Sequence, residues 1–310
     1  MSTPATRAGF VAVVGAPNAG KSTLVNGLVG SKVSIVSPKV QTTRMRVIGI
    51  AMADIPDKGG GEARAQVVLV DTPGIFSVAK RRLERAMVAA AWQGADDADV
   101  VALVVDAERG VGPETKAIAE RLKDTRAPRF LVLNKIDLVP REKLLALTAE
   151  LNAIVPFERT FMVSALKADG IGDLLTAFAQ AMPPGPFLYP EDQAADLPLR
   201  LLAAEVTREQ VFLQLHQELP YEAAVETEKW EDRPDGSVRV EQTIHVQREG
   251  QRAIFLGKGG ARIKQIGARA RHELSQMLER PVHLFLHVKV SERWADDPSH
   301  YRTIGLDYQS

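Results

Sequence analysis

The most informative absence in this chain of 310 residues is cysteine, which does not occur at all. Disulfides and thiolate-bound zinc are therefore excluded, and the composition fits a reducing compartment. No stretch approaches the roughly 18 apolar residues that a membrane-spanning helix needs. The apolar run after Met1–Gly9 is too short for the core of a signal peptide. We therefore expect a soluble, cytoplasmic protein, with peripheral membrane contact left open.

An excess of charge is also lacking, because 39 Lys and Arg residues balance 39 Asp and Glu residues. Net charge alone therefore points to no polyanionic partner, and any such partner must bind a local patch. Hydrophobic residues make up 45% of the chain, which is enough for sizeable cores, and the length favours two domains.

The segment Gly15–Ser22 fits the phosphate-binding loop pattern G-x-x-x-x-G-K-[ST]. The apolar run Phe10–Val14 precedes it and a helix-compatible segment follows, which is the strand–loop–helix context that the motif requires. Lys21 adds positive charge at the β- and γ-phosphates, and Ser22 offers a hydroxyl to Mg²⁺. The residues expected to bind the phosphates are Gly15, Ala16, Pro17, Asn18, Ala19, Gly20, Lys21, Ser22 and Thr23.

Apolar runs recur along the first half of the chain with helical patterns between them. Those after the phosphate loop are Val47–Ala53, Val67–Val70, Val100–Val105, Arg129–Leu133 and Thr160–Val163. This alternation indicates a mainly parallel sheet with helices on both faces, that is, an α/β domain that carries the phosphate-binding loop. Ligands of such sheets bind at the carboxyl ends of the strands, and each motif of this half follows such a run.

Two segments near the phosphate loop are expected to sense the γ-phosphate. The polar segment Ser37–Arg44 carries a threonine that can close on Mg²⁺ when this phosphate is present; we choose Thr43 and keep Thr42 in reserve. Asp71 can hold Mg²⁺ through water, and Gly74 can offer its N–H to the γ-phosphate. The catalytic set is therefore Lys21, Thr43 and Gly74, and the nucleotide-binding set also includes Asp71, Thr72 and Pro73.

A water-orienting glutamine is absent after Gly74, where Ile75 and Phe76 follow. The attacking water must therefore be positioned by other means. Backbone groups are one candidate, and a bound monovalent cation is another. Asn18 is the residue of the phosphate loop that we expect to hold such a cation, K⁺.

The pattern N-K-x-D in Asn134–Asp137 predicts recognition of guanine. Asp137 can accept hydrogen bonds from N1–H and the 2-amino group, and adenine offers neither donor. Asn134 is expected to support the base edge, and the stem of Lys135 to cover the ring. After the next strand come Ser164, Ala165 and Leu166, where the N–H of Ala165 is expected to reach guanine O6.

Two further segments delimit the first domain. The insert Asp54–Gln66 contains three consecutive glycines and is expected to form a flexible hairpin or loop without a chemical role. A Pro-rich stretch begins at Pro183 and marks a boundary. We therefore expect a GTPase domain over residues 1–182, a linker over 183–196 and a smaller α+β domain over 197–310.

The second domain is expected to begin with one or two helical turns around Arg208. Two strands follow at Tyr221–Trp230 and Val238–Val246, then an amphipathic helix at Ala261–Arg280 and a strand at Val282–Val290.

Just before the long helix lies Gly257–Gly260, a G-x-x-G loop of the kind with which K-homology (KH) domains clamp single-stranded nucleic acid. A solvated helix face is the alternative explanation for the charge in this region. The basic residues are Arg248, Arg252, Lys258, Arg262, Lys264, Arg269 and Arg271. The predicted RNA-binding residues are Gly257, Lys258, Gly259, Gly260, Arg262 and Lys264.

These motifs resemble those of the bacterial Era family of GTPases over nearly the whole chain. The resemblance is carried by the phosphate loop and by Gln41–Arg44, Asp71–Gly74, Asn134–Asp137, Arg208–Phe212, His216–Tyr221, Leu256–Gly260 and Ile263–Gly267. It implies a type-2 KH domain that binds the 3′ end of small-subunit (16S) rRNA, with GTP favouring RNA binding, and a role in assembly of the 30S subunit. It also implies partial association with the inner membrane, and we expect a monomer.

A second hypothesis treats the KH domain as a constitutive RNA anchor. The GTPase domain would then be a membrane-associated or cell-cycle signalling switch unrelated to assembly. The two hypotheses differ in whether the bound nucleotide changes the affinity for RNA.

Overall fold

The computed structural model describes residues 5–39, 42–56, 61–76, 82–215, 222–292, 294, 298, 301 and 306–308. The chain divides into two compact units. The first comprises Met1–Asp196 together with Gly305–Ser310, and the second comprises Leu197–Ile304. Each unit is described by itself below.

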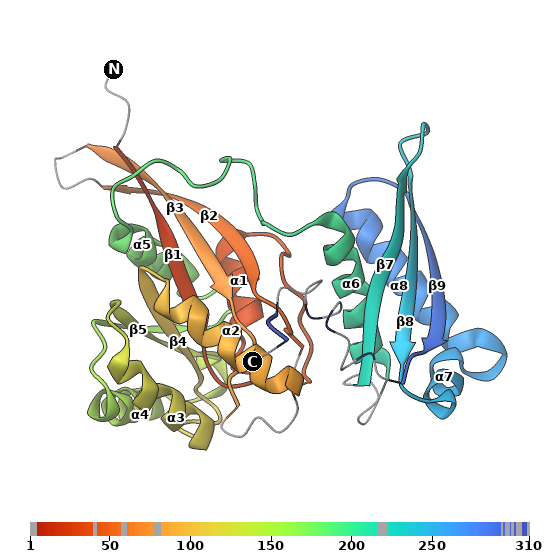
Figure 1. The fold of residues 1–310 in the computed structure, drawn as a ribbon. Helices are drawn as coiled ribbons and strands as arrows, with labels where there is room; N and C mark the ends of the chain where they lie inside the picture. Colours follow the sequence, from red (N-terminus) through yellow and green to blue (C-terminus); the bar gives the residue numbers. More distant parts are fainter. Residues whose placement is uncertain are drawn as a thin grey trace. The chain divides into compact units, whose positions relative to one another are not determined.

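The first unit is built on a six-stranded sheet in the order β2-β3-β1-β4-β5-β6 (Figure 1). All neighbouring strands are parallel except β2 and β3, which form an antiparallel hairpin. The strands are β1 (Ala5–Val14), β2 (Val47–Pro56), β3 (Glu62–Asp71), β4 (Val100–Asp106), β5 (Arg129–Asn134) and β6 (Arg159–Val163). Several of these strands are apolar and buried on both faces, as the near-continuous hydrophobic runs require.

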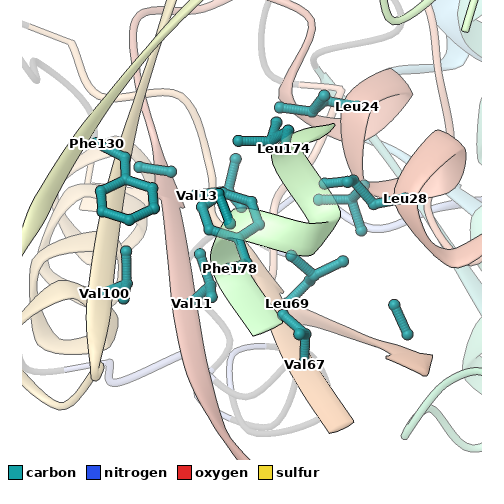
Figure 2. Close-up of a cluster of buried hydrophobic side chains, with 14 of the residues drawn as sticks. Val11, Val13, Leu24, Leu28, Val67, Leu69, Val100, Phe130, Leu174 and Phe178 are labelled. Atoms are coloured by element: carbon teal, nitrogen blue, oxygen red, sulfur yellow. The ribbon is translucent and has the colours of Figure 1, made fainter. Parts of the chain in front are cut away.

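Helices cover both faces of this sheet (Figure 1). The helices are α1 (Lys21–Val29), α2 (Arg82–Asp96), α3 (Pro113–Arg121), α4 (Arg141–Ile154) and α5 (Ile171–Ala181). One core contains side chains of α1 and α5, and the other contains side chains of α2, α3 and α4. Figure 2 shows the first core, where the rings of Phe130 and Phe178 stack with centroids 5.7 Å apart. This packing fixes the carboxyl ends of β1, β3, β4 and β5, from which the nucleotide-site loops leave.

The insert Asp54–Gln66 forms the hairpin that was one of its two expected forms, and strand structure continues into it from both sides. β2 extends to Pro56 and β3 begins at Glu62, with Ile55 paired to Ala63. The short loop between them, residues 57–60, lies outside the described residues. The described residues of the insert therefore belong to the β2–β3 hairpin.

The predicted linker, residues 183–196, groups with the first unit and lies along its sheet (Figure 1). Ala195 forms an antiparallel bridge with Gly49 on the edge strand β2. Gln66 is fully buried and hydrogen-bonds to the linker backbone at Leu188 and Tyr189. The linker backbone is therefore attached to the open edge of β2, where the N–H of Ile50 donates to the carbonyl of Ala194 and the N–H of Asp196 to that of Ile48.

The second unit has a three-stranded sheet in the order β7-β8-β9, with β9 parallel to β8. Its elements are α6 (Leu199–Gln214), β7 (Ala223–Asp232), β8 (Val238–Val246), α7 (Glu249–Leu256), α8 (Ala261–Met277) and β9 (Val282–Val290). Their order matches the expectation, with two differences. The first helix is sixteen residues long rather than one or two turns, and α7 was not expected. α7 has only eight residues, which is too short for its hydrophobic periodicity to stand out in the sequence.

Across the described ranges of both units, no helix combines the length and the apolar character needed to cross a membrane.

Candidate functional site

The phosphate loop connects β1 to α1, and close contacts require glycine at both of its ends. A Cβ atom at Gly15 would lie 2.4 Å from the carbonyl oxygen of Val104, and one at Gly20 would lie 2.3 Å from Asn134 Nδ2. Lys21 folds back over the loop, with Nζ donating to the carbonyls of Gly15 and Ala16 at 3.1 Å each. Burial lowers the pKa of Lys21 to about 8, although the charge of Asp71 opposes this shift.

Four oxygen-bearing side chains, those of Ser22, Ser34, Thr43 and Asp71, converge at this loop. Ser22 Oγ lies 2.8 Å from Thr43 Oγ1 and donates to Asp71 Oδ2 at 2.7 Å. Ser34 Oγ donates to the same carboxylate oxygen at 2.7 Å. Thr42 instead donates to the carbonyl of Lys39 at 2.7 Å, so Thr43 and not Thr42 is the threonine at Ser22.

The carboxylate of Asp71 is fully buried and only partly satisfied. Burial raises its pKa, whereas hydrogen bonds from Ser22 and Ser34 and the charge of Lys21 lower it. Its second oxygen, Oδ1, has no hydrogen-bond partner within the described part of the chain. A buried carboxylate oxygen left unpaired is costly, so this position is suited to a cation or to a water bound to one.

The segment after β3 is attached to the phosphate loop. Thr72 Oγ1 donates to the carbonyl of Val13 at 2.7 Å, and the N–H of Ile75 donates to Gly15 at 3.2 Å. Gly74 lies so close to Pro17 that an added Cβ would be 3.0 Å from it. The segment Asp71–Ile75 is therefore attached both to the end of β1 and to the phosphate loop.

Asn134 joins the three loops that were predicted separately. It is 2% exposed, and its Nδ2 donates to the carbonyl of Ala19 in the phosphate loop at 3.0 Å. Its Oδ1 accepts the N–H groups of Lys135 at 2.9 Å and Ala165 at 3.0 Å. The N–H of Ala165, expected to reach guanine O6, is thus engaged by Asn134 in this structure, and a contact with O6 would have to share it.

Asp137 lies at the base-recognition end of the site. The hydrogen bond from Ser164 is the main cause that lowers its pKa, and Lys167, with Nζ 3.4 Å from Oδ2, adds to it. The carboxyl is therefore ionised at neutral pH and able to accept hydrogen bonds. The side chain of Leu166 is 84% exposed, so it packs on no core in the described structure.

A pocket opens at the phosphate side of these loops. It is lined by Pro17, Asn18, Gly20, Lys21, Ser22, Thr23, Ile35, Val36, Ser37, Pro38, Lys39, Thr42, Thr43, Gly74, Arg109 and Lys135. Sequence reasoning did not include Ser34 or Arg109, and it also missed Asp106, which pairs with Lys135. Asp106 follows the buried run Val100–Val105, so it carried the same strand-end signal that identified Asp71. Ser34 carried no signal in the sequence.

In the second unit, the G-x-x-G loop lies between α7 and α8 and requires its glycines. Gly257, Gly259 and Gly260 have φ angles of 70°, 59° and 78°, which side chains rarely adopt. A Cβ at Gly257 would also lie 2.8 Å from Cβ of Arg262. The loop ends at the N-terminus of α8, where backbone N–H groups and Lys258 favour an anion.

The seven basic residues around this loop are all exposed. Lys264 and Arg271 line a pocket between α8 and β9, together with Gly267, Phe285 and Leu286. A Cβ at Gly267 would lie 3.3 Å from Leu286, so the glycine lets helix and strand approach closely. A pocket lined by apolar and basic side chains is suited to an extended nucleic-acid strand.

Comparison with known proteins bears on both units. A family model described as a 50S ribosome-binding GTPase matches residues 10–135, and one described as a KH domain matches residues 218–295. GTPase Era of Mesorhizobium japonicum is 60% identical over 306 residues, covering 99% of this chain and 96% of the relative. GTPase Era of Brucella suis is 56% identical, covering 98% and 94%.

The chain belongs to the GTPase Era family. The GTPase family model alone would not identify the family, because it matches only part of the first unit. The Era relatives match both units. The fold is likewise that of Era: a P-loop GTPase domain with a mostly parallel sheet, followed by a KH domain.

Two solved Era structures agree with the described fold. Era in complex with MgGDPNP and nucleotides 1506–1542 of 16S ribosomal RNA is 40% identical, with a TM-score of 0.89, and the match covers 97% of this chain and 99% of that one. An Era variant from Aquifex aeolicus bound to GDP and AlF4⁻ is 39% identical, with a TM-score of 0.87, covering 96% and 99%.

Proposed function

We propose that this chain is a GTP-hydrolysing switch that binds the 3′ end of small-subunit rRNA through its KH unit and assists assembly of the 30S subunit. The observation that carries the proposal is the convergence of Ser22, Thr43 and the half-satisfied Asp71 beside a buried lysine. This is the arrangement that binds a Mg²⁺–triphosphate, and it occurs in a chain with a G-x-x-G loop in its second unit.

The residues present fit a Mg²⁺ ion. Ser22 and Thr43 would offer hydroxyl ligands, and Asp71, with its unpaired Oδ1, would hold the ion through water. When bound, the ion neutralises charge on the β- and γ-phosphates. Lys21 would leave its carbonyl partners on the loop for the phosphates, and Gly74 would present its N–H to the γ-phosphate.

A monovalent cation site at Asn18 forms part of the proposal. The side-chain amide of Asn18 donates to the carbonyl of Pro38 at 3.1 Å. The phosphate loop is therefore in contact with the segment Ser37–Arg44, which is expected to sense the γ-phosphate. K⁺ would be held by Asn18 together with backbone carbonyls and would supply positive charge beside the phosphates in a site that has no water-orienting glutamine. We expect faster GTP hydrolysis in potassium than in sodium chloride, and loss of this difference in Asn18→Ala. Equal rates of the wild-type protein in the two salts would contradict the site.

For the RNA, the pocket between α8 and β9 and the G-x-x-G loop support an extended single strand. The rRNA target comes from the similarity to the Era structure that contains 16S nucleotides. The monomeric state and the peripheral contact with the inner membrane stay predictions from the resemblance.

The test is the affinity for an oligonucleotide matching the 3′ end of small-subunit rRNA, measured with a GTP analogue and with GDP at one fixed salt concentration. We expect tighter binding with the analogue. Lys258→Ala and Lys264→Ala should each weaken binding and reduce the salt slope by about 1. The matched control is Lys229→Ala, which removes the same charge from β7, at the other edge of the sheet.

Equal affinity with the analogue and GDP would favour the second hypothesis, a constitutive RNA anchor. An absence of binding in both states would contradict the rRNA target itself.

A further inference from the structure

Asp106 is the last residue of β4 and is 5% exposed. It lies opposite Asn134 in the β4–β5 register, and the N–H of Ala107 donates to the Asn134 carbonyl at 2.9 Å. The carboxylate is therefore held at the strand end from which the guanine-recognition loop also leaves.

The two oxygens of this carboxylate have separate partners. Oδ1 accepts the backbone N–H groups of Glu108 at 2.9 Å and Arg109 at 3.2 Å. Oδ2 accepts from Lys135 Nζ at 2.6 Å, which is a short, charge-assisted hydrogen bond. Arg109 Nε lies 3.7 Å from the same oxygen, but its side chain is 63% exposed. Lys135 is thus the closer of the two cations that face Oδ2.

Lys135 connects the base-recognition loop to the phosphate loop. Its backbone has a φ of 64°, and its Nζ also donates to the carbonyl of Asn18 at 3.0 Å. Asn18 itself has a φ of 63°, so both ends of this connection have an unusual backbone geometry. The side chain of Lys135 is 30% exposed, and its ammonium could be hydrated if no acceptor held it.

We propose that Asp106 is a positioning residue for nucleotide binding, which holds the Lys135 side chain extended between Asn18 and the base loop. Asp106 acts through Lys135 and does not touch the nucleotide itself. With the carboxylate in place, the lysine stem is already in position to cover the guanine ring before the nucleotide enters. The proposal rests on guanine-nucleotide binding at this site, as proposed above.

A purely structural role is the competing explanation, because Oδ1 also satisfies the N–H groups of the loop after β4. Asp106→Asn separates the two roles. An asparagine keeps an oxygen for the N–H groups of Glu108 and Arg109 but directs an NH₂ group, which cannot accept, at Lys135 Nζ.

The experiment measures dissociation of fluorescent N-methylanthraniloyl GDP by stopped flow from the full-length wild-type protein, Asp106→Asn, Lys135→Met and the double variant. We expect about tenfold faster dissociation from Asp106→Asn, the scale of one charge-assisted hydrogen bond. Lys135→Met should also dissociate faster. In the double variant, Asp106→Asn should add little to the effect of Lys135→Met, since the two residues act through one interaction.

Asp99→Asn is the matched control. Asp99 also lies beside β4, but at the opposite end of the sheet, where it accepts the N–H of Phe10 at 2.8 Å. This variant keeps an oxygen for the N–H of Phe10 and should leave the dissociation rate unchanged. Dissociation from Asp106→Asn at the wild-type rate, or full additivity with Lys135→Met, would overturn the proposal. A wild-type protein that binds no guanine nucleotide would instead contradict the proposed function.

Discussion

Lys21 shows how burial and ligand binding act on one residue. Its side chain is 6% exposed, and in the nucleotide-free protein its ammonium bonds only to two loop carbonyls in the described structure. Desolvation therefore lowers its pKa to about 8, against the opposing charge of Asp71. Bound phosphates favour the charged form and would raise this pKa again.

The sign of the resulting pH dependence differs between folding and binding. Because the folded-state pKa lies below the ordinary value of 10.5, the buried charge costs stability below pH 8, and this cost is relieved as the pH rises toward 10.5. Nucleotide binding needs the ammonium, so affinity is fully present below pH 8 and is lost above it.

We therefore expect the affinity for GDP to fall about tenfold between pH 7 and pH 9, as one proton must be taken up above a pKa near 8. The dissociation constant for GDP is measured at each pH by equilibrium titration of the nucleotide-free protein at constant ionic strength. Guanosine is the control, because it shares the titration of the base but offers Lys21 no phosphate. A parallel fall for guanosine would assign the effect to the base, and a flat GDP curve would contradict the lowered pKa.

At the scale of elements, the hairpin β2–β3 and the linker form one structure. Gln66 has its amide buried on β3, where Oε1 accepts from Leu188 at 2.8 Å and Tyr189 at 2.9 Å, and Nε2 donates to the Tyr189 carbonyl at 2.8 Å. Arg64, two residues earlier, pairs with Asp54 and with Glu191 of the linker. β2 begins shortly after the segment that carries Thr43, so the linker is attached next to the loop that we propose to sense the γ-phosphate.

Gln66→Ala should release the linker from the sheet. Three hydrogen bonds to a buried amide are lost and backbone groups of the linker are left unpaired, at a cost of about 1–3 kcal/mol in the free energy of unfolding. Hydrogen exchange of residues 186–196 should rise in the variant. Gln180→Ala, on the exposed surface of α5, is the control and should leave both quantities unchanged. Unchanged exchange in Gln66→Ala would show that the β2 edge alone holds the linker.

At the scale of the whole molecule, the two units differ from the predicted domains at their ends. The predicted linker belongs to the first unit, and so do Gly305–Ser310, which were predicted to end the second domain. Leu306 is buried, and the guanidinium of Arg82 lies 4.4 Å from the ring centroid of Tyr308. A short tail has no periodicity of its own, so its place could not be read from spacing.

The sequence by itself determined the fold class, the family and the loops that carry the chemistry. A phosphate loop, an N-K-x-D segment and a G-x-x-G loop are local patterns, because each needs a particular backbone turn and a few side chains at fixed spacing. Only the tertiary structure decided which groups complete them. Ser34 reaches Asp71, Asp106 holds Lys135 and Gln66 binds the linker, each across a long stretch of chain. These pairings depend on which strand ends the sheet order brings together, and hydrophobic periodicity does not encode that order.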